Sequence, residues 1–291
     1  MTLLYYNCYI MKKGDYMTED FIFPGEDLHD QIIAMDNTLT KKATKFTVDE
    51  QRLFYITLAS IKPTQKGNEI EIDKKAMFDM LGFKSHNYYS RIRGMFKKLA
   101  MASWIEFGDD EIFDDGFLIS AVRTTKRKVY VTIADKYIPL LIELAPGFTR
   151  LLSDDAISFK SKFSMLIYQQ LMRWSHKGIF GATTKELKDL FGMTKDDYVY
   201  NGKFNRQMFE QRTIDVAIQD INEKSKCISN LRYEKKKKGN RIQGYVFYFD
   251  YTDPNNFRKT YNIPEQLSLE DITVDTAELN SLLNDLKEGK L

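Results

Sequence analysis

The sequence has few residues of the kinds that build metal sites and disulfide frameworks. Its 291 residues include two cysteines, Cys8 and Cys227, and three histidines. The cysteines stand far apart and outside any CxxC pattern, which argues against a disulfide framework or a zinc site and favours a reducing cytoplasm. The histidines, His29, His86 and His176, are scattered and form no ligand pair. We therefore expect neither a metal nor a cofactor.

The sequence also lacks an apolar run long enough to span a bilayer, so we expect no membrane partner. The opening segment, MTLLYYNCYIMKKGDYM, carries its charges after its apolar run and has no small-residue cleavage site, unlike a signal peptide. Met1, Met11 and Met17 are each possible starts. We expect residues 1–32 to form a poorly ordered leader.

Motifs for nucleotide hydrolysis and strand cleavage are missing or incomplete. No glycine-rich loop ends in Gly-Lys-Ser/Thr, which argues against a P-loop. The acidic run FGDDEIFDD, residues 107–115, lacks the ligand spacing of a calcium loop and is typical of a solvated turn. Tyr5 and Tyr9 have the spacing of paired catalytic tyrosines in DNA-nicking enzymes, but no His-x-His metal motif accompanies them. We expect no enzymatic activity, and a strand-nicking rolling-circle initiator is the alternative from the enzyme class.

What the sequence does contain is apolar surface and an uneven distribution of charge. Hydrophobic residues make up 43% and aromatic residues 13% of a chain that is longer than one usual domain, which predicts two cores. The net charge is +2, but the segment after Asn262 has seven acidic residues and two lysines. Residues 1–262 therefore carry +7, and this basic body with an acidic tail over 259–291 indicates a polyanionic partner.

The order of predicted elements occurs twice along the chain. In the first half, a helix over 47–61 with Thr47 and Glu50 as a capping box precedes a strand over 68–73 and a short helix over 73–83. A basic helix over 84–101, strands over 104–107, 117–123 and 128–133, and a helix over 134–144 complete this half.

The second half repeats this order after a linker over 145–159. It comprises a helix over 161–176, a strand over 179–183, a short helix over 183–193, a long helix over 203–225 and a hairpin over 228–251. The short helices KKAMFDMLGF and TKELKDLFGM align without gaps, Gly82 on Gly192. The pattern predicts an α+β fold with two tandem winged-helix domains related by internal duplication, over 33–147 and 148–258.

The third helix of each module is the candidate DNA-reading element, because a helix fits the major groove and meets base edges there. In the second module, Asn205 and Arg212 lie two turns apart on one face, and Ile214, Ala217, Ile218 and Ile221 face the core. The alternative is an amphipathic helix with a merely solvated face. The candidate contacts are Lys203, Asn205, Arg206, Gln207 and Arg212.

Basic residues recur at corresponding places in the other elements. Lysine suits phosphate contact more than base discrimination. The first-module segment carries Lys84, Arg91, Arg93, Lys97 and Lys98 with no acidic residue among them. The turn of the first hairpin, or wing, has Arg123, Lys126, Arg127 and Lys128, and the tip of the second has Lys235, Lys236, Lys237, Lys238, Asn240 and Arg241. Four basic segments at matching places favour DNA contact over chance.

With these motifs, the chain resembles the replication initiators of iteron-controlled bacterial plasmids, the Rep_3 family. Asn37, Leu39, Gln51, Arg52 and Tyr55 in the segment NTLTKKATKFTVDEQRLFYITLASI match the start of the family's first helix. The resemblance continues through SKFSMLIYQQLMRW, TTKELKDLFGM, TIDVAIQDINEKS and LRYEKKKKGNRIQGYVFYF, and spans roughly residues 33–250. One departure is Val216, near the place where many relatives have proline.

The resemblance implies a cytoplasmic protein that binds repeated sites in double-stranded DNA at a plasmid origin, helps to open the origin, and recruits the host initiator and replicative helicase. It also implies a homodimer through the first module that represses its own gene. The main base contacts would come from Asn205, Arg206 and their neighbours, and the segment from Asn87 to Lys98, with Tyr88, would contact the adjacent groove. A winged-helix transcriptional regulator without replication activity is the alternative, which a plasmid-maintenance assay would distinguish.

Overall fold

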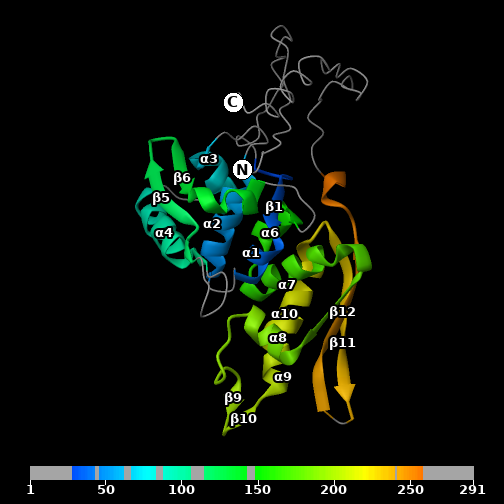
Figure 1. Ribbon diagram of the computed structural model, residues 1–291. Helices are drawn as coiled ribbons and strands as arrows, with labels where there is room; N and C mark the ends of the chain where they lie inside the picture. The colour runs from blue at the N-terminus through cyan, green and yellow to red at the C-terminus, as the bar shows by residue number, and fades with distance from the viewer. Residues whose placement is uncertain are drawn as a thin grey trace, which may run out of the picture. The chain divides into compact units, whose positions relative to one another are not determined.

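The structure, a computed structural model, describes residues 28–42, 46–61, 67–82, 88–105, 115–142, 148–239 and 241–257 (Figure 1). The predicted leader over 1–32 lies outside these ranges except for residues 28–32, and the predicted acidic tail over 259–291 lies outside them completely. Within the described ranges, every helix falls short of the length and apolar character that a membrane span requires.

The first module has the predicted order of helix, strand, helix, helix and hairpin. It contains β1 (Ile32–Asp36), α1 (Asn37–Lys42), α2 (Val48–Ala59), β2 (Glu69–Asp73), α3 (Lys74–Met80), α4 (Tyr88–Ala102), β3 (Trp104–Ile105), β4 (Gly116–Phe117), β5 (Ile119–Thr124) and β6 (Lys128–Ile133). The sheet order is β2-β6-β5, all antiparallel, and β3 pairs with β4. Buried Ile72 and Val131 lie on this sheet, and Phe96 and Leu99 on α4 belong to the same core.

Local capping signals account for where these helices begin. Thr47 and Glu50 form the predicted capping box of α2, in which each side chain accepts a hydrogen bond from the other residue's backbone N–H. Asp73 accepts a hydrogen bond from the backbone N–H of Ala76 at the start of α3. Such bonds satisfy backbone donors that the first turn of a helix leaves without a partner. The predicted helix over 134–144 is instead a 3-10 turn at Asp135–Tyr137 followed by α5 (Pro139–Ile142), and residues 143–147 are outside the described ranges.

The prediction of a linker over 145–159 was wrong for residues 148–159, which the structure describes. These residues form β7 (Phe148–Leu152) and α6 (Ser153–Ser158). The strand β7 pairs with β1 in antiparallel register, with Ile32 opposite Leu152 and Asp36 opposite Phe148. A segment placed between two domains by its sequence is therefore hydrogen-bonded to the first strand, while the predicted boundary between 147 and 148 stays a prediction.

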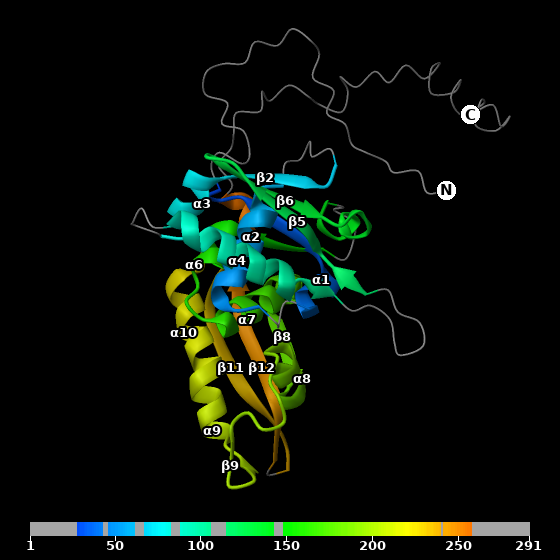
Figure 2. The ribbon, with the colours of Figure 1, turned by 90° about the vertical axis from the view of Figure 1, so that its left-hand side faces the viewer.

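The second module repeats the order of the first. It contains α7 (Lys162–Arg173), a 3-10 turn (Ser175–Lys177), β8 (Ile179–Thr183), α8 (Thr184–Leu190), β9 (Val199–Tyr200), β10 (Lys203–Phe204), α9 (Arg206–Phe209), a π-helical segment (Glu210–Ile214), α10 (Asp215–Lys224), β11 (Ile228–Lys238), β12 (Arg241–Tyr251) and a 3-10 turn (Pro254–Asn256). Its sheet order is β11-β12-β8. Figure 2 shows α10 beside the long hairpin of β11 and β12.

The two short helices confirm the internal repeat. The helix α8 begins with a capping box of Thr183 and Glu186, at the place where Asp73 caps α3. Gly82 and Gly192, the residues aligned from sequence, follow the two helices with φ of 67° and 65°. This left-handed conformation costs glycine little, which accounts for glycine at both helix ends. Two winged helices in tandem are thus confirmed.

Direct contacts between buried side chains connect α2 to the chain that follows the first module. Gln169 on α7 donates a hydrogen bond to the hydroxyl of Tyr55, with Nε2 and Oη 2.5 Å apart. Arg52 donates to the carbonyl of Phe159, at 2.8 Å. Both Tyr55 and Gln169 are fully buried, so each would lose a hydrogen bond that water could not replace if the other were removed.

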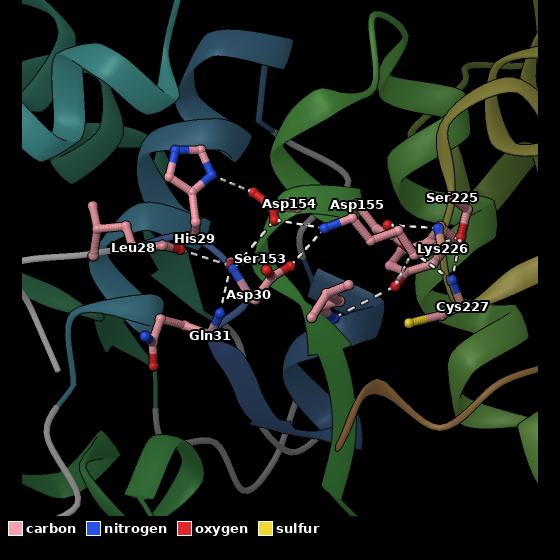
Figure 3. A network of polar contacts seen from close by, with 12 residues as sticks. Leu28, His29, Asp30, Gln31, Ser153, Asp154, Asp155, Ser225, Lys226 and Cys227 are labelled. Atoms are coloured by element: carbon pink, nitrogen blue, oxygen red, sulfur yellow. Dashed lines mark hydrogen bonds and ion pairs between the residues drawn. The ribbon is translucent and has the colours of Figure 1, made fainter. Parts of the chain in front are cut away.

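A polar network joins residues 28–31, α6 and the turn between α10 and β11 (Figure 3). The buried carboxylate of Asp155 accepts hydrogen bonds from the Tyr168 hydroxyl at 3.0 Å, the Ser225 hydroxyl at 2.5 Å, and the backbone N–H groups of Lys226 and Cys227 at 2.8 and 3.1 Å. Four donors offset the cost of removing this carboxylate from water. Burial also raises the pKa of the Cys227 thiol, which keeps it protonated.

The neighbouring carboxylate, Asp154, extends the network to the N-terminal segment. It lies 2.6 Å from His29 Nδ1 and 3.1 Å from Lys226 Nζ, and Lys226 also lies 2.6 Å from Asp30 (Figure 3). Residues 28–31 therefore belong to the folded body, although the sequence suggested that they end a poorly ordered leader.

Candidate nucleic-acid interface

The candidate reading helix of the second module consists of α9, the π-helical segment and α10, residues 206–224. It begins later than predicted. Lys203 and Phe204 form β10, and Asn205 is the N-cap of α9, its side chain accepting a hydrogen bond from Met208 N at 3.0 Å. The reason lies in Asn201 and Gly202, which both have positive φ, 48° and 71°. Two such residues in succession make the tight turn of a two-residue β-hairpin. The prediction of a helix from residue 203 was therefore wrong, and Lys203 lies on a strand.

The reading helix also contains a π-helical segment, at Glu210–Ile214, that its sequence did not predict. The wider turn changes the register between α9 and α10, so the residues after it face differently from those of a regular helix. Gln207, Gln211 and Arg212 are exposed, whereas Phe209 and Glu210 are buried. Ile214, Ala217 and Ile221 are buried as predicted, and Ile218 is half-buried.

Arg206, predicted to contact bases, is half-buried and held by the second wing. Its guanidinium donates to the Thr184 hydroxyl, the Tyr245 hydroxyl and the Ile242 carbonyl, each at 3.2 Å. These partners lie on α8 and β12, so Arg206 fastens the start of α9 to both. A DNA contact by Arg206 stays a prediction, and this geometry gives the residue a positioning role.

Glu210 is a connecting residue that the sequence did not single out. Its buried carboxylate accepts a hydrogen bond from the Tyr245 hydroxyl at 2.9 Å and lies 2.7 Å from Lys235 Nζ. Burial raises the pKa of Tyr245 to about 12. Arg206 acts to lower this pKa and the hydrogen bond to Glu210 acts to raise it, so the phenol remains protonated and a donor. Lys235, predicted to be part of a DNA-contacting tip, is thereby engaged within the protein.

The four lysines of the second wing lie on a strand and not in its turn, which corrects the sequence prediction. Lys235 to Lys238 end β11, and the turn follows at Gly239, whose φ is 58°. Cross-strand pairing shifts between Lys236 and Lys237, because Gln243 is an extra residue in β12. Lys236, Lys237, Lys238 and Arg241 are exposed, and Asn240 is outside the described residues.

In the first module, α4 presents cations opposite its buried face. Arg93, Lys97 and Lys98 are exposed, and Ile92, Phe96 and Leu99 are buried. Arg93 and Lys97 are four residues apart and share a face of the helix. Of the other predicted contacts here, Lys84 and Asn87 are outside the described residues; Tyr88 and Arg91 lie on α4.

The first wing has fewer available charges than its sequence suggested. Arg123 lies 3.0 Å from a carboxylate oxygen of Glu69 and stacks over the Tyr130 ring, and Lys128 pairs with Glu71. Lys126 and Arg127 are exposed in the short connection between β5 and β6. Two of the four predicted residues are thus paired with acids across the sheet.

The strands β9 and β10, with their Asn201-Gly202 turn and the preceding Tyr198, form a small hairpin that we call the finger (residues 198–204). This hairpin was not predicted from the sequence, although an Asn-Gly pair is a strong local signal for a hairpin. A groove of about 540 Å³ lies between the finger and the reading helix, and Tyr200, Asn205 and Arg212 are among its lining residues. Asn205 and Arg212, predicted to share a face, therefore line one groove.

The other candidates from the sequence were a metal site, paired catalytic tyrosines and the acidic run. Among the described residues there is no group of three or more His, Cys, Asp or Glu side chains that could hold a metal ion. Tyr5 and Tyr9, and residues 107–114 of the acidic run, are outside the described ranges.

Comparison with one solved structure supports the fold. The structure of the Pi initiator protein in complex with iteron DNA matches with a TM-score of 0.62 and 18% sequence identity, over 77% of this chain and 98% of that one. A structure of domains 2 and 3 of RctB matches with a TM-score of 0.42 and 11% identity, over 71% and 82%. No curated protein sequence matches this chain.

Family models match both modules. The model described as initiator replication protein, WH1, matches residues 32–172, and the model described as initiator Rep protein, WH2, matches residues 183–249. The first match includes β7, α6 and most of α7, in agreement with the pairing of β7 with β1. With tandem winged helices, basic exposed elements and both family models in sequence order, the chain belongs to the Rep_3 family of replication initiator proteins.

Proposed function

We propose that this protein is a sequence-specific double-stranded DNA-binding initiator of plasmid replication that binds repeated origin sites, the iterons. The observation that carries the proposal is the second module's exposed face. There Gln207, Gln211 and Arg212 are exposed on a reading helix whose Glu210 bonds to the second wing, and that wing exposes Lys236 to Lys238. Amide and guanidinium groups can pair with adenine and guanine in the major groove, and lysines bind phosphate.

The first module supplies a second reading helix with the same division of labour. Arg93, Lys97 and Lys98 on α4 are exposed, as are Lys126 and Arg127 in the first wing. The Pi initiator, whose fold this chain shares, has been solved in complex with iteron DNA. Binding by insertion of two helices, with phosphate contacts from two wings, would give the long and specific footprint that an origin repeat requires.

We also propose partners for this protein and a way in which it regulates its own gene. The chain acts in the cytoplasm without catalysing a reaction, recruits the host initiator and the replicative helicase, and dimerises through its first module to repress its own gene. Family membership supports these roles, and each needs its own measurement. For the dimer, that measurement is sedimentation of the full chain over a range of concentrations.

The central proposal is tested with the full chain and randomised duplex DNA. Repeated selection should enrich one sequence, and that sequence should occur as direct repeats beside the gene. A plasmid carrying those repeats should be maintained only when the gene is present. If a sequence is selected but the plasmid replicates equally well without the gene, the protein is a regulator and not an initiator.

A further inference from the structure

The finger and the second wing both contact the start of the reading helix, at Phe209. Phe209 on α9 packs against Tyr198 and Phe204 at centroid distances of 5.7 and 5.6 Å, and against Tyr245 of β12 at 6.3 Å. The start of the helix therefore packs against both the finger and the hairpin. Figures 1 and 2 both show the finger, α9 and the tips of β11 and β12 at the same end of the second module.

The finger exposes much of its surface, but its turn, its base and its packing on the helix fix its conformation. Its turn has the backbone conformation that Asn-Gly favours, and the backbone N–H of Asn205 donates to the Tyr198 carbonyl at 2.7 Å, which closes its base. Tyr198 itself has a φ of 61°, which is unfavourable for a non-glycine residue. Strain of this kind persists only where surrounding contacts enforce it, here the packing on Phe209.

The outer surface of the finger carries groups that bind phosphate. Tyr200 is 73% exposed, which is unusual for so large a side chain, and Lys203 is exposed on the paired strand. A tyrosine hydroxyl and a lysine ammonium are both common donors to phosphate oxygens in DNA complexes. An exposed aromatic ring at a hairpin tip otherwise has an unfavourable contact with water.

The groove between the finger and the reading helix has the charge to hold a polyanion. Its lining includes Lys162 and Arg212, and one carboxylate, Asp197. That carboxylate is already occupied, because it accepts hydrogen bonds from the backbone N–H and the hydroxyl of Thr194, at 2.6 and 2.9 Å. These bonds lower the pKa of Asp197, so it stays ionised, and the two cations exceed it by one charge.

We propose that the finger is a third DNA-binding element, which holds the sugar-phosphate strand on the side of the major groove opposite the wing. A helix in the major groove has one phosphate strand on each side, about 12 Å apart across the groove. With the wing on one strand, the other runs along the groove between finger and helix, where its phosphates contact Tyr200, which lines the groove, and Lys203, which pairs with Tyr200 across the finger. This inference rests on the proposed function and adds a second backbone contact to it.

The test uses the full chain and the duplex that it selects from randomised DNA, with single phosphates replaced by uncharged methylphosphonates. A double variant, Tyr200→Phe with Lys203→Ala, should bind about tenfold more weakly and with a salt slope lower by about 1. At the phosphates that the finger contacts, a methylphosphonate should weaken the binding of wild type but should not change the affinity of this variant. At the phosphates that the wing contacts, a methylphosphonate should likewise leave the affinity of Lys237→Ala unchanged. The two sets of phosphates should lie on opposite sides of the major groove.

The control is Lys177→Ala, which removes the same charge near Phe249, at the end of β12 far from the tip. It should leave the phosphate pattern and the affinity unchanged. The inference is overturned if the double variant keeps the wild-type pattern, if the phosphates at which a methylphosphonate leaves its affinity unchanged coincide with those of Lys237→Ala, or if the control loses as much affinity. Failure of the proposed function is a different result, because the full chain would then select no sequence at all.

Discussion

At the residue scale, the side chains that join the reading helix to the second wing are the most consequential. Glu210 connects the two elements through Tyr245 and Lys235, and Arg206 connects them through Tyr245 and Ile242. Arg206 and Glu210, on successive turns of one helix, thus both hydrogen-bond to the Tyr245 hydroxyl on β12. These bonds connect the helix to the wing near its tip, and the bonds between Asn222 and Leu231 connect the two elements farther from it.

Glu210→Gln should destabilise the second module by about 1–3 kcal/mol, because a neutral amide cannot match a lysine ammonium at a buried site. Urea unfolding of the full chain measures the change. Glu234→Gln is the matched control, since Glu234 is exposed on β11, and it should stay within about 0.5 kcal/mol of wild type. Equal effects of the two substitutions would contradict a tethering role for Glu210.

Asp154 makes stability depend on acid pH. Burial acts to raise its pKa, but hydrogen bonds from the Asp30 carboxyl, whose own pKa is raised by burial and by Asp154, and from His29 and Lys226 outweigh this and hold the pKa of Asp154 at about 2, below the ordinary 3.8. A carboxylate with a lowered pKa stabilises the fold above about pH 4, and that contribution is lost as the pH falls towards 2. The difference in unfolding free energy between wild type and Asp154→Asn should therefore shrink between pH 5 and pH 2.5. A constant difference over this range would contradict the assignment.

At the scale of the elements, Gly244 sets how closely β12 can approach β8. A Cβ atom at this position would lie 2.3 Å from the Ala182 carbonyl oxygen and 2.8 Å from Thr183 Cα, both of them backbone atoms. Gly181 lies on β8 in the same pair of strands, and a Cβ atom there would have nothing within 4 Å. The two glycines therefore give opposite expectations for the same substitution.

Gly244→Ala should separate β12 from β8 and lower the free energy of unfolding by about 3 kcal/mol. Gly181→Ala should change it by less than about 0.5 kcal/mol. Hydrogen exchange of the backbone amides on β8 would show whether the loss is local to this pair of strands. If Gly181→Ala destabilised as much as Gly244→Ala, a general loss of strand quality would explain both.

Elements with local signals could be predicted from the sequence. The capping box at Thr47 and the glycine at 192 mark helix ends through bonds within a few residues, and both were predicted correctly. The strand β7 could not be predicted in this way, because its partner β1 lies more than 100 residues earlier. The finger has a local signal, Asn201-Gly202, but its second strand, Lys203–Phe204, was assigned to the helix predicted over 203–225.

The candidate site was predicted less completely than the fold. The sequence predicted the candidate reading helices and the basic wings, but not which cations have partners within the protein. Arg206, Lys235 and Lys128 bind groups on other elements, at sequence separations of 22 to 57 residues. Only the folded chain brings such groups together, so basic composition overestimates the charge available to DNA.

At the scale of the whole molecule, affinity and specificity should depend on different residues. Replacing Lys236, Lys237 and Lys238 with alanine should weaken specific and non-specific binding alike and lower the salt slope by up to about 3. Arg212→Ala should instead lower the ratio of specific to non-specific affinity, by about tenfold. Titrations of the selected duplex and a scrambled one at two salt concentrations measure both quantities. A larger loss of ratio in the triple variant would contradict this division.

The pairing of β1 with β7 also has a consequence for how the protein is made. As the chain leaves the ribosome, the apolar strand Ile32–Asp36 emerges long before Phe148–Leu152 is synthesised. At about 5–20 residues per second, it waits roughly 5 to 25 seconds with an unpaired edge. During that interval, neighbouring nascent chains offer the same edge to one another, so slower translation before residue 148 should increase misassembly on polysomes.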